Sequence, residues 1–319
     1  MKMLRKFILS LSIVCCLCVN QLAGIVCEDV PIIPSQLNIV GNRKGTVALA
    51  AIFQNEAQFL KEWIEYHRMI GVSHFYLYNN LSNDGYLGIL KPYLEQGIVE
   101  LFDVPFDSSL MRDGAVTHNF VQVCCYNHAL EIAKSANKWL VVIDTDEFVC
   151  PMQSRNLVSF LRNYRGVGGV VAYWQIFGTS GIWDIGPGEL LIDKLTHKYP
   201  QNYDENWQFK SIVRTKYAEG FYDPHCCKYI EGKFSISPNY QMFRHGKPYP
   251  EIPVDTLRIN HYTFRTESFY QKVKKPRKAM WGFVPSPEHE EEFKRLSNSV
   301  EDLSMQRFVE RLKIRVFLK

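Results

Sequence analysis

The sequence lacks the features that mark nucleic-acid-binding, repeat or multidomain proteins. Its formal charge is +4, but three of these charges come from Lys2, Arg5 and Lys6, so the rest of the chain is close to neutral. A near-neutral chain gives no electrostatic reason to expect nucleic acid as a partner. No internal repeat or low-complexity linker interrupts the 319 residues. One large domain is therefore the simplest organisation.

Cysteine spacing that would hold zinc is also missing. Cys15, Cys16, Cys18 and Cys27 fall in the N-terminal segment, and no Cys-x-x-Cys pair occurs among the other five, which are Cys124, Cys125, Cys150, Cys226 and Cys227. A structural zinc site is therefore not indicated. Because five is an odd number, at least one of these cysteines has no partner within the set. The pairing of the others stays open.

Residues 1–27 are predicted to be a signal peptide or a signal anchor. A short basic patch precedes an apolar run over residues 7–19, and small and apolar residues continue to Cys27. Residues 7–26 are long enough to cross a bilayer, although Asn20 and Gln21 interrupt the run. The rest of the chain is expected to be exported or lumenal, either secreted or held at a membrane through this segment.

Residues 46–144 alternate between apolar runs and amphipathic segments. Strands are predicted at 46–53, 72–80, 98–104 and 139–144, with helices at 54–71, 86–97 and 118–137. This alternation favours an α/β fold with a mostly parallel central sheet that is covered by helices. Further along, a short helix is predicted at 156–164 and strands at 168–178, 209–215 and 256–264. Residues 286–319 have helical spacing and are expected to form a tail packed on a domain at 45–285.

Polar side chains follow three of the predicted parallel strands. Asn55 and Glu56 come after the first strand, Asn79, Asn80 and Asp84 after the second, and Asp144, Asp146 and Glu147 after the fourth. The carboxyl ends of parallel strands meet at one edge of the sheet, where ligands bind in open α/β folds. The sequence therefore predicts a binding site at this edge.

The stretch 138–151, KWLVVIDTDEFVCP, runs from an apolar strand into three acids. Two carboxylates in an Asp-x-Asp pair disfavour each other's charge. A Mg²⁺ or Mn²⁺ ion, which takes oxygen ligands from carboxylates and phosphates, resolves that conflict. A calcium-binding loop is excluded because its further acids and glycine are missing. An aspartyl phosphatase is disfavoured by Phe148 and by the late position of the strand.

Five ordered stretches carry a resemblance to a known family. They are NEAQFLKEWIEYHRMIGVSHFYLYNNLSNDG, KWLVVIDTDEFVCP, YWQIFGTSG, FKSIVRT and INHYTFRTESFYQKVKKPRKA, and together they cover most of residues 46–280. With these stretches the chain resembles glycosyltransferase family 92. Two departures are visible: His128 stands in CCYNHAL where the family has an acid, and Thr215 ends SIVRT where proline is usual.

The resemblance implies a GT-A-like fold, a UDP-sugar donor with galactose favoured, a glycan acceptor and inversion at the anomeric carbon. It also implies that Asp144 and Asp146 bind Mn²⁺ or Mg²⁺, and that His261 completes the metal or diphosphate site. Asn55, Glu56, Asn79, Asn80, Asp84 and Lys275 are the candidates for donor binding. Lys275 belongs to a basic run, 272–278, that could screen a diphosphate.

Inversion also needs a base that accepts the proton of the acceptor hydroxyl. Residue type and position leave four candidates, which are Glu205, Asp184, Asp223 and His225, with Glu205 slightly favoured. Trp174 and Phe177 are candidates for stacking on the acceptor sugar, although both also suit a core. Two rival functions stay open: a carbohydrate-binding protein on a transferase fold without turnover, and a metal-dependent phosphatase.

Overall fold

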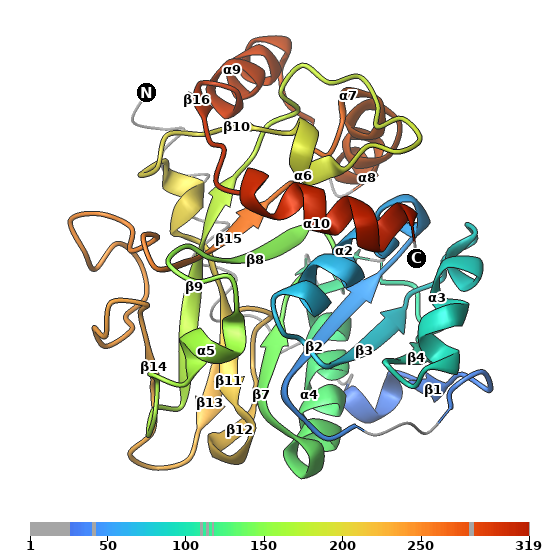
Figure 1. Ribbon diagram of the computed structural model, residues 1–319, viewed down its shortest axis with the longest axis vertical. Helices are drawn as coiled ribbons and strands as arrows, with labels where there is room; N and C mark the ends of the chain where they lie inside the picture. The colour runs from blue at the N-terminus through green and yellow to red at the C-terminus, as the bar shows by residue number, and fades with distance from the viewer. Residues whose placement is uncertain are drawn as a thin grey trace.

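A computed structural model describes residues 26–39, 43–108, 111–112, 115–116, 118–280 and 284–318. Its ten-stranded sheet has the order β1-β4-β3-β2-β7-β11-β9-β15-β8, with β14 paired to β9 (Figure 1). The strands of this sheet are β1 (Ile33–Pro34), β2 (Gly45–Phe53), β3 (His74–Asn79), β4 (Val99–Asp103), β7 (Asn137–Val142), β8 (Glu147–Pro151), β9 (Gly169–Ile176), β11 (Phe209–Arg214), β14 (Ser235–Ile236) and β15 (Leu257–His261).

Four central strands, β4, β3, β2 and β7, pair in parallel, as the alternating pattern predicts. The expected α/β fold with a largely parallel central sheet is thus confirmed. Beyond β7 the direction changes, since β11 is antiparallel to both β7 and β9. The strand β8, which the sequence analysis did not predict, follows the acidic stretch directly and pairs antiparallel with β15.

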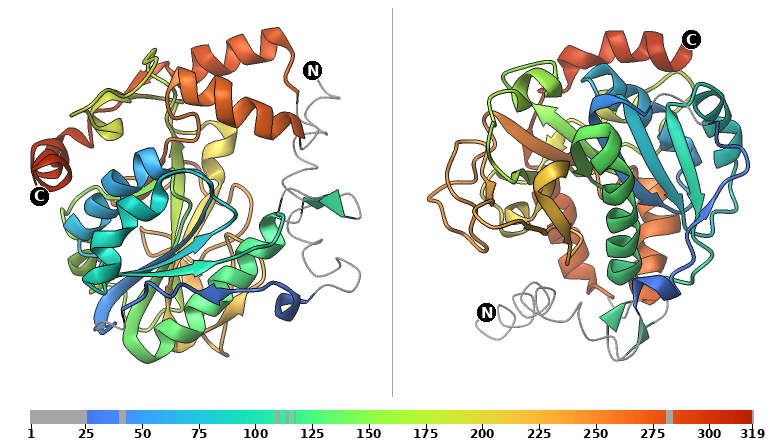
Figure 2. Two further views of the ribbon diagram at one scale, coloured as in Figure 1. Left: turned by 90° about the vertical axis from the view of Figure 1, so that its right-hand side faces the viewer. Right: turned by 90° about the horizontal axis from the view of Figure 1, so that it is seen from below.

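Helices cover both faces of the sheet (Figure 2). The main helices are α2 (Ala57–Met69), α3 (Tyr86–Glu95), α4 (His118–Ala136), α5 (Leu157–Leu161), α6 (Leu191–Lys194), α7 (Glu267–Phe269), α8 (Lys275–Met280), α9 (Pro287–Ser297) and α10 (Gln306–Phe317). Along β2, Val47 and Leu49 face the core beneath α2 and α3, while Ala48 and Ala50 face α4. This alternation is the period of two that a strand buried on both faces requires.

Short elements complete the chain. They are the helical turns η1 (Cys27–Asp29), η2 (Asp204–Trp207), η3 (Thr215–Tyr217) and η4 (Tyr270–Lys274), and the strands β5 (Met111–Arg112), β6 (Ala115–Val116), β10 (His197–Lys198), β12 (Ala218–Phe221), β13 (Cys227–Tyr229) and β16 (Val300–Glu301). The turn η4 is π-helical. A π-helical turn is rare and is often found at functional sites.

The C-terminal helix α10 packs on α2 and shares its core. Phe308, Val309 and Leu312 are buried in the same hydrophobic cluster as Trp63 and Ile64 of α2. Arg315 extends this contact, since its Nε lies 2.8 Å from Glu65 Oε2. The helix is therefore part of the main hydrophobic core.

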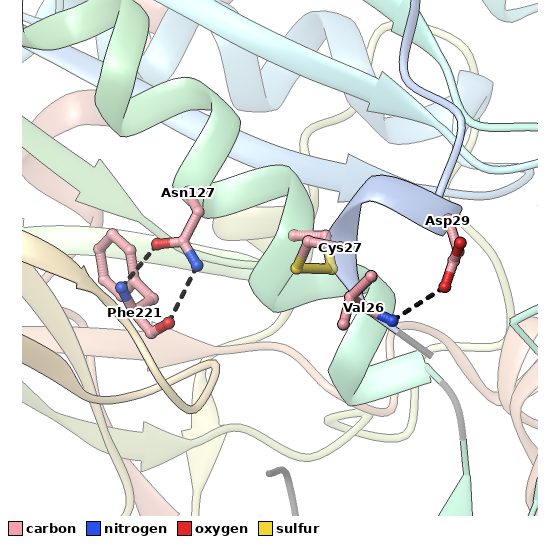
Figure 3. The surroundings of a disulfide bond; sticks show 6 residues. Val26, Cys27, Asp29, Asn127 and Phe221 are labelled. Carbon is pink, nitrogen blue, oxygen red and sulfur yellow. Dashed lines mark hydrogen bonds between the residues drawn. A yellow bond between two sulfur atoms is a disulfide. The ribbon is translucent and has the colours of Figure 1, made fainter. Parts of the chain in front are cut away.

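Most of the predicted leader lies outside the described residues, but its last two residues do not. Cys27, which was grouped with the leader, forms a disulfide with Cys124 on α4 (Figure 3). One turn along α4, Asn127 exchanges two hydrogen bonds with the backbone of Phe221. Cys27 thus belongs structurally with the folded part of the chain. Among the described residues, Cys125, Cys150, Cys226 and Cys227 form no disulfide. Within the described segments, no helix has the length and apolar character needed to span a membrane.

The two departures from the family pattern have local explanations. Thr215 donates a hydrogen bond from Oγ1 to the carbonyl oxygen of Asn137 at 2.5 Å, which proline could not do. His128 on α4 lies with Nδ1 2.9 Å from the Tyr78 hydroxyl on β3. Both side chains therefore connect secondary-structure elements at positions away from the acids.

Candidate functional site

Asp144 follows β7 and joins three elements. Gln122 on α4 donates to its Oδ1 at 2.5 Å, and Lys210 on β11 approaches its Oδ2 at 3.0 Å. Burial opposes the negative charge, but Lys210 keeps the pKa of Asp144 below its ordinary value. A third of the side chain (33%) remains exposed. Asp144 is therefore a carboxylate that is held in place and still open on one side.

Asp146 is more deeply buried and has two neighbouring side chains with nitrogen atoms, Lys274 and His261. Lys274 in η4 donates to Oδ2 at 2.6 Å, and His261 Nε2 at the end of β15 lies 3.5 Å from Oδ1. Although burial would raise the pKa of Asp146, Lys274 and then His261 hold it well below its ordinary value. The backbone is fixed as well, because Tyr262 N donates to Asp146 O at 2.8 Å.

Lys210 and Glu147 form the buried floor beneath these two acids. Glu147 is fully buried, accepts a hydrogen bond from the Asp144 amide at 2.9 Å, and lies 3.9 Å from Lys210 Nζ. Burial raises the pKa of Glu147 well above its ordinary value, with Lys210 opposing the shift. Burial would lower the pKa of Lys210, but Asp144 and Glu147 raise it. These two residues, with Asp144, Asp146, His261 and Lys274, are called the carboxylate–lysine cluster below.

Arg265 connects this cluster to the loop after β2. Its Nη2 donates to Glu56 Oε2 and to the carbonyl oxygen of Thr145, each at 2.8 Å. The guanidinium is buried and packs over the ring of Phe59, with Cζ 4.3 Å from the centroid. Arg265 also has a left-handed backbone (φ 55°), a conformation that arginine rarely adopts. Glu56, a predicted donor-binding residue, therefore stabilises the Asp-x-Asp loop indirectly, because it holds the Arg265 side chain that bonds Thr145.

The other acids and amides predicted to bind the donor mainly organise the loops. Asn55 accepts from the Asn83 amide at 2.8 Å, and Asp84 accepts from the Ala57 amide at 2.8 Å at the start of α2. Asn79 donates to Asp103 Oδ1 and Tyr86 OH, both at 2.9 Å. Asn80 donates to two carbonyl oxygens, those of Val104 and Phe106. These residues do lie at the predicted sheet edge, but their polar atoms have protein partners.

Within the basic run 272–278, the lysine that lies in the carboxylate–lysine cluster is Lys274 and not the predicted Lys275. Lys275 forms an ion pair with Glu290 of α9 at 2.7 Å, whereas Lys274 reaches Asp146. Lys274 is the last residue of the π-helical turn η4, and Lys275 is the first residue of α8. The two side chains therefore point in different directions. Of the two lysines, Lys274 is therefore the one in the cluster.

The two aromatic candidates for acceptor binding have different environments. Phe177 is fully buried and packs on Tyr262, with ring centroids 4.7 Å apart, so it presents no face to an acceptor. Trp174 is partly exposed and contacts two histidines, His261 at 4.3 Å and His225 at 5.7 Å between centroids. Of this pair, only Trp174 lies beside the carboxylate–lysine cluster.

His225 is the base candidate that contacts Trp174. Its Nδ1 lies 2.6 Å from the carbonyl oxygen of Phe209, so Nδ1 carries the proton and Nε2 keeps a lone pair. Burial, reinforced by Lys210, lowers the pKa of His225 to about 4. Asp223 accepts from the His225 amide at 2.8 Å and thus shapes this turn. With a pKa of about 4, the His225 imidazole next to Trp174 is neutral near pH 7, so its Nε2 is unprotonated there, although it is a weaker base than an ordinary histidine.

The two remaining base candidates, Asp184 and Glu205, lie outside the carboxylate–lysine cluster. Asp184 is exposed, and its Oδ1 is 3.5 Å from Gln58 Nε2 and 2.9 Å from the Ile185 amide. Glu205 lies in η2, where burial raises its pKa and its Oε2 has no partner within the described residues. No direct contact joins either carboxylate to the described side chains of the carboxylate–lysine cluster.

Sequence reasoning missed Lys210, Gln122 and Arg265. Lys210 had a visible signal, because it is the one charged residue in the buried strand FKSIV. A charged side chain that must be buried on such a strand needs a partner of opposite charge. Gln122 and Arg265 carried no comparable signal, since each lies in a mixed helical or loop sequence.

The donor atoms partly fit a divalent cation. Within the described segments, no three His, Cys, Asp or Glu side chains are grouped so that they could hold a metal ion. Asp146 Oδ1 and His261 Nε2, at 3.5 Å, are close enough to share one ion with ligand distances of about 2.1 Å. Mg²⁺ and Mn²⁺ commonly take only one or two carboxylates from a protein and complete their shell with phosphates and water. Two converging donors beside the half-open Asp144 satisfy that requirement.

Comparison of the sequence with known proteins identifies the family of this chain. Residues 43–245, more than half of the chain, match the sequence pattern described as glycosyltransferase family 92. The chain belongs to glycosyltransferase family 92. Its carboxylate–lysine cluster includes Asp144, Asp146, Glu147 and Lys210 from within the matched region.

Relatives with this family name occur in plants. A family 92 protein of Ricinus communis is 28% identical over 243 residues, which are 73% of this chain and 39% of that protein. One of Arabidopsis thaliana is 27% identical over 246 residues, 72% of this chain and 38% of that protein. The chain thus spans about two fifths of the length of these relatives. Among solved structures, Staphylococcus aureus TarS in complex with UDP-GlcNAc is 14% identical, with a TM-score of 0.33 over 53% of this chain and 45% of that one.

Proposed function

We propose that this family 92 member transfers a hexosyl group, galactose in the first instance, from a UDP-sugar to a glycan hydroxyl with inversion. The observation that carries the proposal is the carboxylate–lysine cluster at the carboxyl end of β7. It brings two aspartates, two lysines and a histidine together at the edge where open α/β sheets bind ligands. Family membership supplies the reaction class.

Lys274 is the proposed ligand of the departing diphosphate, and it reaches the site from η4, where Asp146 holds it. Lys210 on β11 is buried against Asp144 and Glu147, so it is proposed to add positive charge beneath the site without contacting the diphosphate. Fixed cations in a buried site stabilise negative charge more strongly than solvated ones, because their orientation costs no reorganisation during the reaction. The cluster would thus favour the transition state, in which charge builds up on the diphosphate.

Asp146 and His261 are the proposed protein ligands of Mn²⁺ or Mg²⁺. Asp144 lies beside them with a third of its side chain exposed, and phosphate and water would complete the shell of the ion. When bound, such an ion neutralises the diphosphate and makes it a better leaving group. Arg265 keeps the Asp-x-Asp loop in position through Thr145 and Glu56.

His225 is proposed as the base, in preference to Glu205, Asp184 and Asp223. Its Nε2 takes the proton of the acceptor hydroxyl, whose oxygen forms a bond to the anomeric carbon. The bond from that carbon to the diphosphate oxygen breaks, and its electron pair leaves with UDP. The attack comes from the face opposite the diphosphate, so the configuration inverts. Trp174, next to His225, offers a ring on which the acceptor sugar stacks.

The proposal is tested by following UDP release from UDP-galactose, UDP-glucose and UDP-GlcNAc with a mixture of released glycans as acceptor. Transfer requires a glycosylated product, identified by mass spectrometry, which disappears in the Asp146→Ala variant. UDP-sugar binding without any product would favour the non-catalytic carbohydrate-binding protein. Hydrolysis of phosphomonoesters in place of transfer would favour the phosphatase.

The export of the protein and its association with a membrane through residues 1–27 are proposals too. They depend on the basic and apolar N-terminal sequence, most of which lies outside the described residues. The disulfide between Cys27 and Cys124 is consistent with an oxidising compartment, where such bonds persist.

A further inference from the structure

A hollow of about 360 Å³ lies between α5 and the segment that follows β14. It is far from the carboxylate–lysine cluster. Thr256 on its rim precedes His261 by five residues, roughly 16 Å along the extended chain of β15. The hollow also follows β8, at the end opposite Glu147. Its volume lies at the lower end of the range for small-molecule sites, about 300–1,000 Å³.

Two stacked tyrosines form one wall of this hollow. The rings of Tyr164 and Tyr240 are 4.8 Å apart between centroids and 8° from parallel. Tyr164 is buried and anchored, because its hydroxyl donates to the carbonyl oxygen of Pro238 at 2.5 Å. Tyr240 is 60% exposed, so its outer face is free to receive a ligand.

The backbone of Tyr240 has an unusual conformation. Its φ is 65°, in the left-handed region that bulky side chains rarely adopt. Two hydrogen bonds hold this turn, from Tyr240 N to Ser237 O and from Ser237 N to Gln241 O. Strained backbone that the surrounding structure maintains is found preferentially at functional sites. Here the left-handed conformation of Tyr240 places its ring at the edge of the hollow.

The rest of the lining specifies the chemical class of the ligand. Among the described residues, no charged side chain lines the hollow. Its other walls are formed by Gln153, Ser154, Ser159, Phe160, Asn163, Pro238 and Thr256. Within the described part of the chain, the side chains of Gln153, Ser159 and Asn163 make no hydrogen bond. An uncharged site with free amides and a hydroxyl excludes nucleotides, acidic glycans and metal ions as its preferred ligands.

We propose that this hollow is a second saccharide-binding site that takes a neutral mono- or disaccharide unit. The C–H face of the pyranose packs on the outer face of Tyr240, whose ring carries partial negative charge on that face. Amides of Gln153 and Asn163 and the hydroxyl of Ser159 bind the sugar hydroxyls. This inference does not depend on the transfer reaction, since none of these residues belongs to the carboxylate–lysine cluster.

Saturation-transfer NMR on the full chain tests the proposal with lactose, N,N′-diacetylchitobiose and mannobiose, each at about 10 mM, a concentration suited to weak binding. UDP is added in excess to occupy the transfer site. Five proteins are compared: the natural chain, Tyr240→Ala, Tyr240→Phe, Asn163→Ala and Asp146→Ala. Because the Tyr240 side chain is largely exposed, its replacement is expected to leave the fold intact, which a thermal melt verifies.

The expected result is binding of at least one saccharide that is weakened about tenfold by Tyr240→Ala and by Asn163→Ala. Tyr240→Phe keeps the ring and retains binding, and Asp146→Ala retains it as well. Binding that Tyr240→Ala leaves unchanged would overturn the proposal, and so would the absence of binding by all three saccharides. Binding lost only in Asp146→Ala would place the sugar in the transfer site and would also overturn it.

Discussion

Lys274 Nζ lies 2.6 Å from Asp146 Oδ2, although 128 residues separate the two in sequence. This ion pair joins the π-helical turn η4 to the loop that follows β7. Asp146 is buried, and Lys274 and His261 together compensate the charge that burial would otherwise disfavour. The segment after β15 therefore completes the site whose acids come from the middle of the chain.

Replacing Lys274 with alanine should weaken UDP binding by about tenfold or more, since a charge-assisted hydrogen bond contributes roughly 1.5–3 kcal/mol. Lys275→Ala is the matched control, because its side chain pairs with Glu290 on α9. That change should alter UDP affinity by less than about twofold. Calorimetric titration of both variants distinguishes them. Equal losses would contradict the assignment of Lys274 to the donor site.

Lys210→Met should lower the free energy of unfolding by about 3–5 kcal/mol, because it leaves Asp144 and Glu147 without their buried cation. Denaturant unfolding measures the loss. Adding Asp144→Asn to Lys210→Met should recover part of it, since the carboxylate whose pKa Lys210 keeps low is then removed. If the double variant is no more stable than Lys210→Met alone, Lys210 stabilises the fold by packing and not by its charge. Lys216→Met, which replaces an exposed lysine, serves as the control.

His225→Gln should lower kcat by about 10²–10⁴-fold, the usual contribution of a general base, and leave UDP affinity unchanged. Gln fills most of the imidazole volume but has no basic nitrogen, so it tests the proton acceptor directly. Glu205→Gln is the comparison and should retain most of the activity. Steady-state kinetics with a glycan acceptor separates the two. A large loss in Glu205→Gln together with full activity in His225→Gln would identify Glu205 as the base.

The stability of the protein should fall as the pH drops below about 6.5, because His67 is buried as a neutral imidazole. Its Nδ1 lies 2.8 Å from Trp63 O, and its Nε2 accepts from the Val149 amide at 3.2 Å. Burial lowers the pKa of His67 to about 3. Between pH 6.5 and 3 the unfolded chain binds a proton that the folded chain does not, so the free energy of unfolding decreases with falling pH.

This histidine alone should remove about 2 kcal/mol between pH 6.5 and 5. Urea unfolding at a series of pH values measures the slope. His67→Gln should be less stable at pH 8, where His67 makes its full contribution, and should show a shallower slope below pH 6.5. Parallel pH profiles for the two proteins would contradict this account of His67.

Much of the fold could be predicted from the sequence because its elements have clear periodicity. The first three strands and the helices between them are buried on defined faces, and Ala48 and Leu49 illustrate how regularly the two faces alternate. The strand β8 could not be predicted, since EFVCP begins within the acidic motif and pairs with β15, more than a hundred residues later. That pairing is a tertiary property without a local signal.

Within the site, the sequence indicated Asp144, Asp146 and His261, which the structure brings together. It could not choose between Lys274 and Lys275, because the choice depends on the register of a π-helical turn. It could not exclude Phe177 either, since aromatic residues serve equally well in cores and sugar sites. Packing against Tyr262 decides that case.

The central claim is that the carboxylate–lysine cluster binds a nucleotide diphosphate together with a divalent cation. Calorimetric titration of UDP into the full chain, with and without Mn²⁺, tests it most directly, using Asp146→Ala and the exposed-site control Asp184→Ala. The account predicts binding that requires Mn²⁺, vanishes in Asp146→Ala and persists in Asp184→Ala. Failure of the folded natural protein to bind UDP with Mn²⁺ present, or unchanged binding in Asp146→Ala, would contradict it.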